Sequence, residues 1–335
     1  MLRRTLKKIS IVLILGLTFN SCAKRENVNQ SNVKTENIEK INILDWNGEK
    51  IEETIGNENE GIIINAQVYV YNNKMYKGRI NKTVPDVETV ENVLFNGEKM
   101  VKEKSAYDEN DKNNGAQQKY YYAYYEDGNK KATYDNDEVK GLIDYRGYKN
   151  YRFNYFDTKA TYLDASNMDE VSRENAIMEA LNINVKPFKY FENIENDKVT
   201  KQVEFFNELD GAPILYPRIT SIDYTYIQLV ESDIVNIEFL YSSEFSKAKE
   251  EVTHLISPEE LLKIIENEYK NGNLSETDDW IMDRIILGYM ETDVETVTPV
   301  WIITTNHGYF DVVVFAFDAV TGKMVFDIGR GDTEQ

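Results

Sequence analysis

The sequence predicts an α+β protein in which a β-rich amino-terminal domain precedes two units, each a helix packed on an antiparallel sheet. Short runs rich in Val, Ile, Tyr and Phe recur between turn residues, as is typical of strands. After residue 60, helical spacing of apolar residues appears at three places, and several strand-like runs follow the second and the third. This repeated order, one helix and then strands, predicts the two carboxyl-terminal units.

The first residues have the composition of a secretory signal. Four positive charges among the first eight residues precede an uncharged and mainly apolar run, residues 9–19. A run of this length is too short to cross a bilayer comfortably as a helix. A positive start followed by a short apolar run indicates a signal peptide, which we place at residues 1–21 and exclude from the fold.

The single cysteine of the chain, Cys22, follows directly after the small residue Ser21. This order resembles the lipobox of bacterial lipoproteins, although Phe19 and Asn20 depart from its commonest residues. The resemblance implies cleavage after Ser21, a diacylglycerol on Cys22, and a protein held at the outer face of the cytoplasmic membrane. Two acyl chains on one residue provide stable anchoring, because each buried methylene adds about 0.8 kcal/mol. An uncleaved anchor helix and a secreted protein with a chance cysteine are the alternatives.

The chain is strongly acidic, with a formal net charge of -20. Nucleic-acid binding requires a basic surface that displaces counterions, so we exclude nucleic acid as a partner. The same negative charge makes it unfavourable for the folded part of the chain to bind flat on a surface of anionic lipid. The expected contact with the membrane is therefore the amino-terminal lipid, while the acidic surface keeps the folded part soluble.

A polar segment follows the lipidated cysteine and has few apolar residues. We expect residues 22–60 to form a flexible tether, with at most a small docking patch around Trp46. The β-rich domain is then placed at 61–165. Its single helix is predicted at 85–95, where valines and a leucine follow helical spacing, and a strand is predicted at 150–156.

The region 166–335 contains the two predicted units. In the first, a helix at 172–182 has Ser172 as its expected N-cap. In the second, a helix at 257–269 opens with Ser257, Pro258 and, three residues after the serine, Glu260. This arrangement predicts a capping box with proline at the first helical position. Strands are expected after each helix, at 201–219, 233–241, 283–290, 298–306 and 309–328.

The second unit resembles PepSY-type domains and the extracellular accessory proteins that regulate the WalK sensor kinase. The residues that carry the resemblance are S-P-E-E at 257–260, P-V-W at 299–301 and the turn F-D-A-V-T-G-K at 317–323. The first unit resembles the same module more weakly. The layout of the whole chain is similar to that of lipoproteins of low-GC Gram-positive bacteria that carry a domain of unknown function. These resemblances imply a fold and a regulatory role, and they imply no catalysis.

Motifs for catalysis or metal binding are missing from the sequence. The chain has two histidines, His254 and His307, and no H-E-x-x-H, Walker A, G-x-S-x-G or G-x-G-x-x-G motif. The acidic loops expected at 107–115 and 134–141 lack the ligand spacing of an EF-hand. With 58 acidic residues, a chance pair of carboxylates carries little information. We therefore predict no catalytic residue, no metal ligand and no cofactor.

The predicted function is that of a lipid-anchored extracytoplasmic protein, not an enzyme, that binds or regulates an envelope protein or peptide partner. Two alternatives stay open: a cell-envelope hydrolase with an unrecognised carboxylate site, and a small-ligand carrier lipoprotein. Acids with strongly raised pKa in a deep cleft would favour the hydrolase. An exposed sheet edge with a shallow apolar groove would favour the binding protein.

Overall fold

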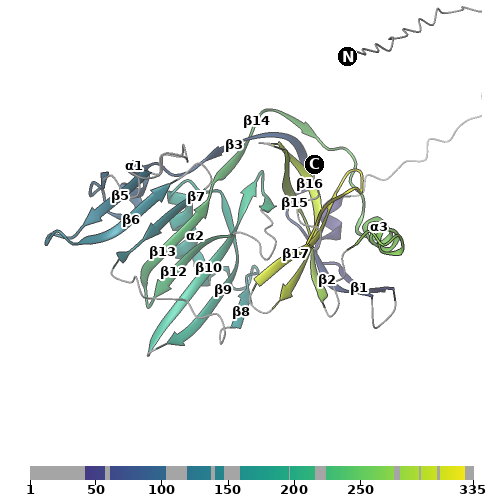
Figure 1. Cartoon of the computed structure of the whole chain (residues 1–335), viewed down its shortest axis with the longest axis horizontal. Coiled ribbons are helices and arrows are strands. Elements are labelled where there is room, and N and C mark those ends of the chain that lie inside the picture. Colours follow the sequence, from purple (N-terminus) through teal and green to yellow (C-terminus); the bar gives the residue numbers. More distant parts are fainter. Residues whose placement is uncertain are drawn as a thin grey trace, which may run out of the picture. The chain divides into compact units, whose positions relative to one another are not determined.

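The computed structural model describes residues 42–56, 61–102, 119–136, 140–146, 159–195, 197–215, 224–274, 280–293, 296–307 and 310–328. Strands dominate this part of the chain, and all of them belong to one mixed sheet of 18 strands (Figure 1). The α-helices found there are α1 (Val87–Leu94), α2 (Ser172–Ala180) and α3 (Pro258–Lys270), preceded by a 3-10 helix, η1 (Ile43–Trp46).

Six strands form the first region of the sheet, in the spatial order β1-β2-β15-β16-β17-β18. Its pairs are antiparallel except for β2 and β15, which run parallel. One face is covered by α3, whose Leu261 and Ile265 are buried beside Trp301 of β16. The strand bounds are β1 (Lys50–Ile55), β2 (Ile62–Val70), β15 (Ile281–Asp293), β16 (Thr296–His307), β17 (Phe310–Asp318) and β18 (Met324–Asp327).

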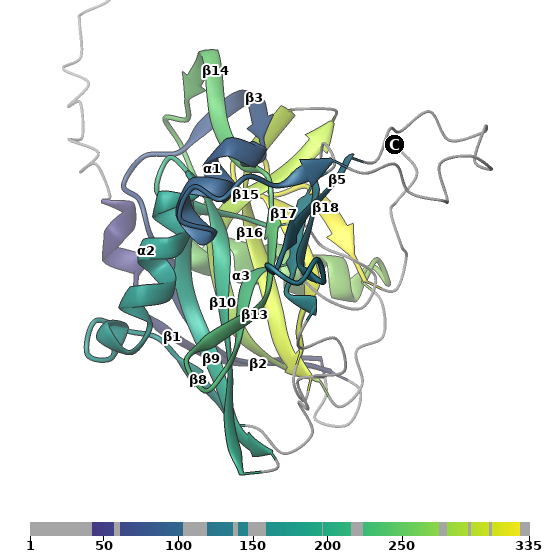
Figure 2. The ribbon, with the colours of Figure 1, turned by 90° about the vertical axis from the view of Figure 1, so that its left-hand side faces the viewer.

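Nine strands form the second region, in the order β8-β9-β10-β12-β13-β7-β6-β5-β4, with every pair antiparallel. Val90 of α1 and Met178 of α2 are buried in one apolar cluster with side chains of β10, β12 and β13, and Figure 2 shows α2 alongside β9 and β10. The strand bounds are β4 (Val101–Lys102), β5 (Lys119–Tyr124), β6 (Lys130–Asn136), β7 (Lys140–Asp144), β8 (Lys159–Tyr162), β9 (Val185–Glu195), β10 (Lys198–Leu209), β12 (Thr225–Val230) and β13 (Asp233–Leu240).

Three further strands join the two regions. Strand β11 (Ala212–Leu215) pairs with β10 on one side and runs parallel to β15 on the other. Strand β3 (Tyr76–Thr83) pairs with both β14 (Ser242–Glu251) and the start of β16. The backbone ladder is therefore continuous from one region to the other.

The predicted fold class is wrong. Instead of a β-rich domain followed by two PepSY-like units of helix packed on sheet, the chain forms one large mixed sheet. The strands after α3 are antiparallel to one another, but β15 also takes the amino-terminal strand β2 as a parallel neighbour, with Ile285 opposite Val68. Likewise β7, from the amino-terminal half, pairs with β13. The expected boundary between 61–165 and 166–335 thus does not divide the sheet.

The expected tether does not extend through residues 42–56. This stretch forms η1 and β1, and β1 pairs with β2 along its whole length, from Lys50 opposite Gln67 to Ile55 opposite Ile62. Trp46 is 7% exposed and belongs to the main apolar cluster, with its ring centroid 5.8 Å from that of Trp301. Burial of a large aromatic ring is the physical reason that this polar segment joins the fold.

The local signals at the helices were largely correct. The Asp86 side chain caps α1 by accepting the amide of Thr89, and Ser257 and Glu260 form the predicted capping box of α3. Ser172, however, does not cap α2: a 3-10 helix, η4 (Met168–Val171), runs directly into α2, so Val171 holds the N-cap position. The strand predicted at 150–156 lies outside the described residues.

Candidate functional site

Strand β1 forms one edge of the sheet, because its pairing partner among the described residues is β2 alone. The amide of Val68 donates to the carbonyl of Glu49, just before β1, at 2.9 Å. Hydrogen-bonded pairs alternate along an antiparallel ladder. The backbone N–H and C=O groups of Glu52 and Thr54 therefore point away from β2, toward the open edge.

A groove of about 540 Å³ lies between the end of β1 and α3. The side chains of Ile51, Glu53 and Ile55 share the face of β1 that α3 covers, since their partners on β2 belong to the buried cluster. In Figure 1, α3 lies on the same side of the molecule as β1. The lining consists of Glu53, Thr54, Ile55, Gly56, Glu259, Leu262, Lys263, Glu266, Tyr269 and Lys270.

The groove combines an apolar strip with charged rims. Leu262 and Tyr269 are partly buried on the helix side and face Ile55 on the strand side. Glu266 of α3 pairs with Lys270, at 2.5 Å, so these two charges offset each other. Glu53, Glu259 and Lys263 form no ion pair with any described residue, so two carboxylates and one ammonium group give the groove a net negative charge.

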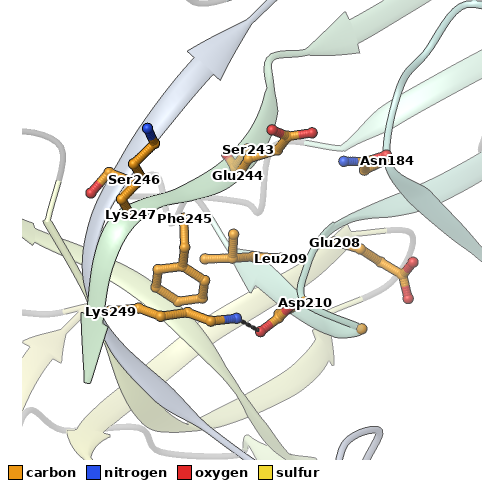
Figure 3. A pocket seen from close by; sticks show the side chains of 11 residues that line it. Asn184, Glu208, Leu209, Asp210, Ser243, Glu244, Phe245, Ser246, Lys247 and Lys249 are labelled. Atoms are coloured by element: carbon orange, nitrogen blue, oxygen red, sulfur yellow. Dashed lines mark hydrogen bonds and ion pairs between the residues drawn. The ribbon is translucent and has the colours of Figure 1, made fainter. Parts of the chain in front are cut away.

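A second hollow, of about 570 Å³, lies where β10 ends and β14 begins (Figure 3). We call it the Glu208 hollow. Leu209 and Phe245 face each other in its interior, and Glu208 and Glu244 come from the two different strands. An adjoining hollow of about 500 Å³ shares Asn184, Glu208 and Glu244 with it.

Hydrogen bonds hold the walls of the Glu208 hollow in place. The amide of Glu208 donates to the carbonyl of Asn184 at 2.8 Å, and the amide of Asn184 donates to Ser242 Oγ at 2.9 Å. Lys249 pairs with Asp210 at 2.5 Å and lies 4.0 Å from the centre of the Tyr76 ring. Between Phe245 and Lys249 the register with β3 shifts, which forms a bulge at the rim. Bulges of this kind often re-aim side chains beside functional sites.

Two groups in the Glu208 hollow are electrostatically unusual. Burial raises the pKa of the Glu208 carboxyl above its ordinary value, and the nearby Lys186 ammonium offsets part of that effect. Ser243 is 2% exposed, and its Oγ has no hydrogen-bond partner within the described part of the chain. A buried hydroxyl without a partner is destabilising, so it needs an explanation.

The structure brings together none of the residues that the sequence singled out for chemistry. Cys22 and Ser21 lie outside the described residues. His254 is exposed in the segment before α3 and lines neither the groove nor the Glu208 hollow. Among the described residues, no three acidic, histidine or cysteine side chains are grouped closely enough to hold a metal ion. No described helix is both long and apolar enough to span a bilayer.

Sequence reasoning missed both sites. The groove depends on β1, whose sequence K-I-E-E-T-I has too few apolar residues to stand out from a polar segment. The sequence signal for β1 was weak. It consisted of two isoleucines, Ile51 and Ile55, at positions that share one face of a strand, and of Trp46 upstream. The Glu208 hollow depends on Asn184, Glu208 and Glu244, which are brought together by the pairing of distant strands and carry no local motif.

No family model matches the chain, and no curated protein matches it either. The fold is similar to that of an uncharacterized protein from Eubacterium rectale ATCC 33656, solved by crystallography at 1.45 Å resolution. The similarity has a TM-score of 0.57 at 13% sequence identity and covers 84% of this chain and 97% of the other. At this identity the likeness extends to the fold alone.

Proposed function

We propose that this chain is a lipid-anchored, non-catalytic protein at the outer face of the cytoplasmic membrane. It binds an extended segment of a partner protein. The observation that carries the proposal is the open edge of β1 beside the groove under α3. An added strand gains main-chain hydrogen bonds at such an edge, and a neighbouring groove selects its side chains. The lipid on Cys22 confines the protein to a surface, where weak affinities gain from a high effective concentration.

The groove sets the chemistry of the segment that binds there. Side chains of an added strand alternate between two faces, so every second one meets Ile55, Leu262 and Tyr269. Apolar residues fit this strip. Glu53 and Glu259 favour a Lys or Arg at a neighbouring position, and the net charge of -20 attracts basic partners from a distance. The occupant is therefore a basic, extended peptide with apolar residues at alternate positions.

A random-peptide library selected on the full chain in detergent tests this proposal. We expect selected peptides to combine Lys or Arg with alternating apolar residues. Thr54→Pro removes an outward N–H while keeping a backbone that edge strands tolerate. The loss of one ladder bond and the bulk of the ring should weaken binding at least tenfold, whereas the matched control Thr54→Ala should bind like the wild type.

A second variant addresses the helix side of the groove. Leu262→Glu places a charge against the apolar strip and should also weaken binding at least tenfold, with little change in folding because Leu262 is only partly buried. Peptides that bind both variants as well as the wild type would contradict the site. A library that yields no binder at all would contradict the function.

The hydrolase alternative has less support. Burial raises the pKa of Glu208, but Glu244, the other glutamate that lines the hollow, is exposed and not enclosed in a deep cleft.

A further inference from the structure

A third hollow, of about 270 Å³, lies on the face of β2 that is turned away from α3. Ala66 and Val68 of this strand are buried in the cluster under α3, so Asn65, Gln67 and Tyr69 point to the opposite face. Side chains from β1, β8 and β15 complete the lining, which consists of Lys50, Asn65, Ala66, Gln67, Tyr69, Tyr162, Asp283 and Arg284. We call this site the Tyr162 hollow.

Polar side chains cross the Tyr162 hollow in one row. Lys50 of β1 lies opposite Gln67 of β2, and Gln67 in turn lies opposite Arg284 of β15. Residues opposite each other on neighbouring strands project to the same face, about 4.8 Å apart. Asn65 and Tyr69 flank Gln67 along β2, and the Tyr69 hydroxyl donates to Gln67 Oε1 at 3.3 Å. Hydrogen-bonding groups therefore surround a central glutamine on all four sides.

An irregularity in β15 brings a buried arginine into this row. Met282 and Ile285 both belong to the cluster under α3, so the two residues between them turn away from it. These are Asp283 and Arg284, and the register with β2 shifts at this point. Arg284 is 6% exposed, and its Nε lies 3.5 Å from the Asp283 carboxylate. A buried guanidinium is costly unless its N–H groups are bonded, and Tyr162 accepts one of them.

Arg284 holds the ring of Tyr162 in a fixed position at the hollow. The guanidinium donates to the Tyr162 hydroxyl at 3.0 Å, and its central carbon lies 4.6 Å from the centre of the ring. Tyr162 nevertheless remains 39% exposed. The strand that carries it is also fixed, because the amide of Leu163 donates to the carbonyl of Phe188 at 2.8 Å. A partly exposed ring that is already held in one orientation loses little conformational entropy when it binds a flat apolar surface.

The charges around the hollow favour a neutral ligand. Lys50 and Arg284 carry positive charges. Asp283 lines the same hollow, and Glu52 lies beside it on the same face, opposite Asn65 of β2. These two positive and two negative charges sum to zero, so they give neither a cation nor an anion a net attraction.

Neutral amide groups and a tyrosine ring together define the chemistry of the ligand. Asn65 and Gln67 are exposed, and each amide offers N–H donors and an oxygen acceptor. Hydroxyl groups, which also donate and accept, match such amides. The ring of Tyr162 instead fits a flat patch of C–H groups. A sugar ring combines both surfaces in one small molecule, and a hollow of about 270 Å³ suits roughly one or two such rings.

We propose that the Tyr162 hollow binds a neutral saccharide, with one sugar ring stacked on Tyr162 and its hydroxyls bonded to Asn65, Gln67 and Lys50. Arg284 is a positioning residue that keeps the Tyr162 ring oriented. The site is independent of the groove under α3, which lies on the opposite face of the sheet.

A microarray of neutral and acidic glycans, probed with the full chain in a detergent that lacks a sugar headgroup, tests the proposal. We expect saturable binding to neutral glycans and at least tenfold weaker binding to acidic ones, which the net charge of -20 repels. Tyr162→Ala should weaken binding at least tenfold, and Asn65→Ala at least fivefold. The matched control Tyr125→Ala, which removes a 53% exposed tyrosine between β5 and β6, should bind like the wild type.

Stability measurements and two further variants separate a ligand role from a structural one. Asn65→Ala changes an exposed residue, so it should melt at the wild-type temperature while binding less tightly. Tyr162→Phe keeps the ring but loses the bond from Arg284, so its affinity should lie between those of the wild type and Tyr162→Ala. Leu262→Glu, in the groove under α3, should leave glycan binding unchanged. No saturable binding to any neutral glycan, tighter binding of acidic glycans, or unchanged binding by both Tyr162→Ala and Asn65→Ala would overturn the proposal.

Discussion

Replacement of Trp46 by alanine tests whether the segment before β1 belongs to the fold. The side chain is 7% exposed, and a buried Trp removes roughly 230 Å² from water. At about 25 cal/mol per Å² this burial is worth about 6 kcal/mol, and a compact unfolded chain lowers the figure by roughly a quarter. We expect Trp46→Ala to lower the free energy of unfolding by about 4 kcal/mol, within the usual range for such a substitution.

Urea denaturation of the chain from residue 23 onward, followed by circular dichroism, measures this loss. Leu44→Ala is the matched control, because Leu44 lies in the same 3-10 helix and is 39% exposed. The Leu44→Ala substitution should lower the free energy of unfolding by less than about 1 kcal/mol, as at other exposed positions. If Trp46→Ala costs no more than Leu44→Ala, the segment is a tether after all, and the edge formed by β1 has no basis.

Three further predictions concern the lipid anchor, a buried ion pair and a close contact between two strands. Cys22→Ala should move the protein from the detergent phase to the aqueous phase on cell fractionation, and retention in detergent would rule out the lipid. Glu204→Gln removes the carboxylate that pairs with buried Lys189 at 2.9 Å, so urea denaturation should show a loss of about 3–5 kcal/mol, and a loss below 1 kcal/mol would mean that the pair is solvated. Gly288→Ala puts a methyl group 2.6 Å from the carbonyl oxygen of Pro213, which should push β11 from β15 and destabilise the chain by about 1–3 kcal/mol; an unchanged melting temperature would argue against that close approach.

Local signals in the sequence were sufficient to locate the described α-helices, although Ser172 does not cap α2. The capping box at Ser257 fixes the start of α3, because its hydrogen bonds lie within four residues of one another. The Asp127-Gly128 pair is a typical hairpin-turn sequence, and Gly128 lies between β5 and β6 at a positive φ of 82°. The run at 311–317 also lies within a buried strand, β17, with side chains in clusters on both faces.

The assembly of the sheet could not be predicted in the same way. Ile285 of β15 pairs with Val68 of β2 although more than two hundred residues separate them in the chain. Turn residues indicate only pairings between strands that are close in sequence, so they do not predict this one. The repeat of a helix followed by strands was real as a local pattern, but it does not decide which strands become neighbours. Both candidate sites lie where these distant strands meet, so their residues were not visible as a motif.

Hydrogen–deuterium exchange of β1, with and without a selected peptide, tests the central claim most directly. The outward amides of Glu52 and Thr54 are the donors that an added strand would use. We predict that the peptide slows exchange of these two amides at least tenfold, and leaves the amides of Ile51 and Glu53, already bonded to β2, little changed. Protection confined to residues away from β1 and α3, with Glu52 and Thr54 exchanging at their free rates, would contradict strand addition at this edge.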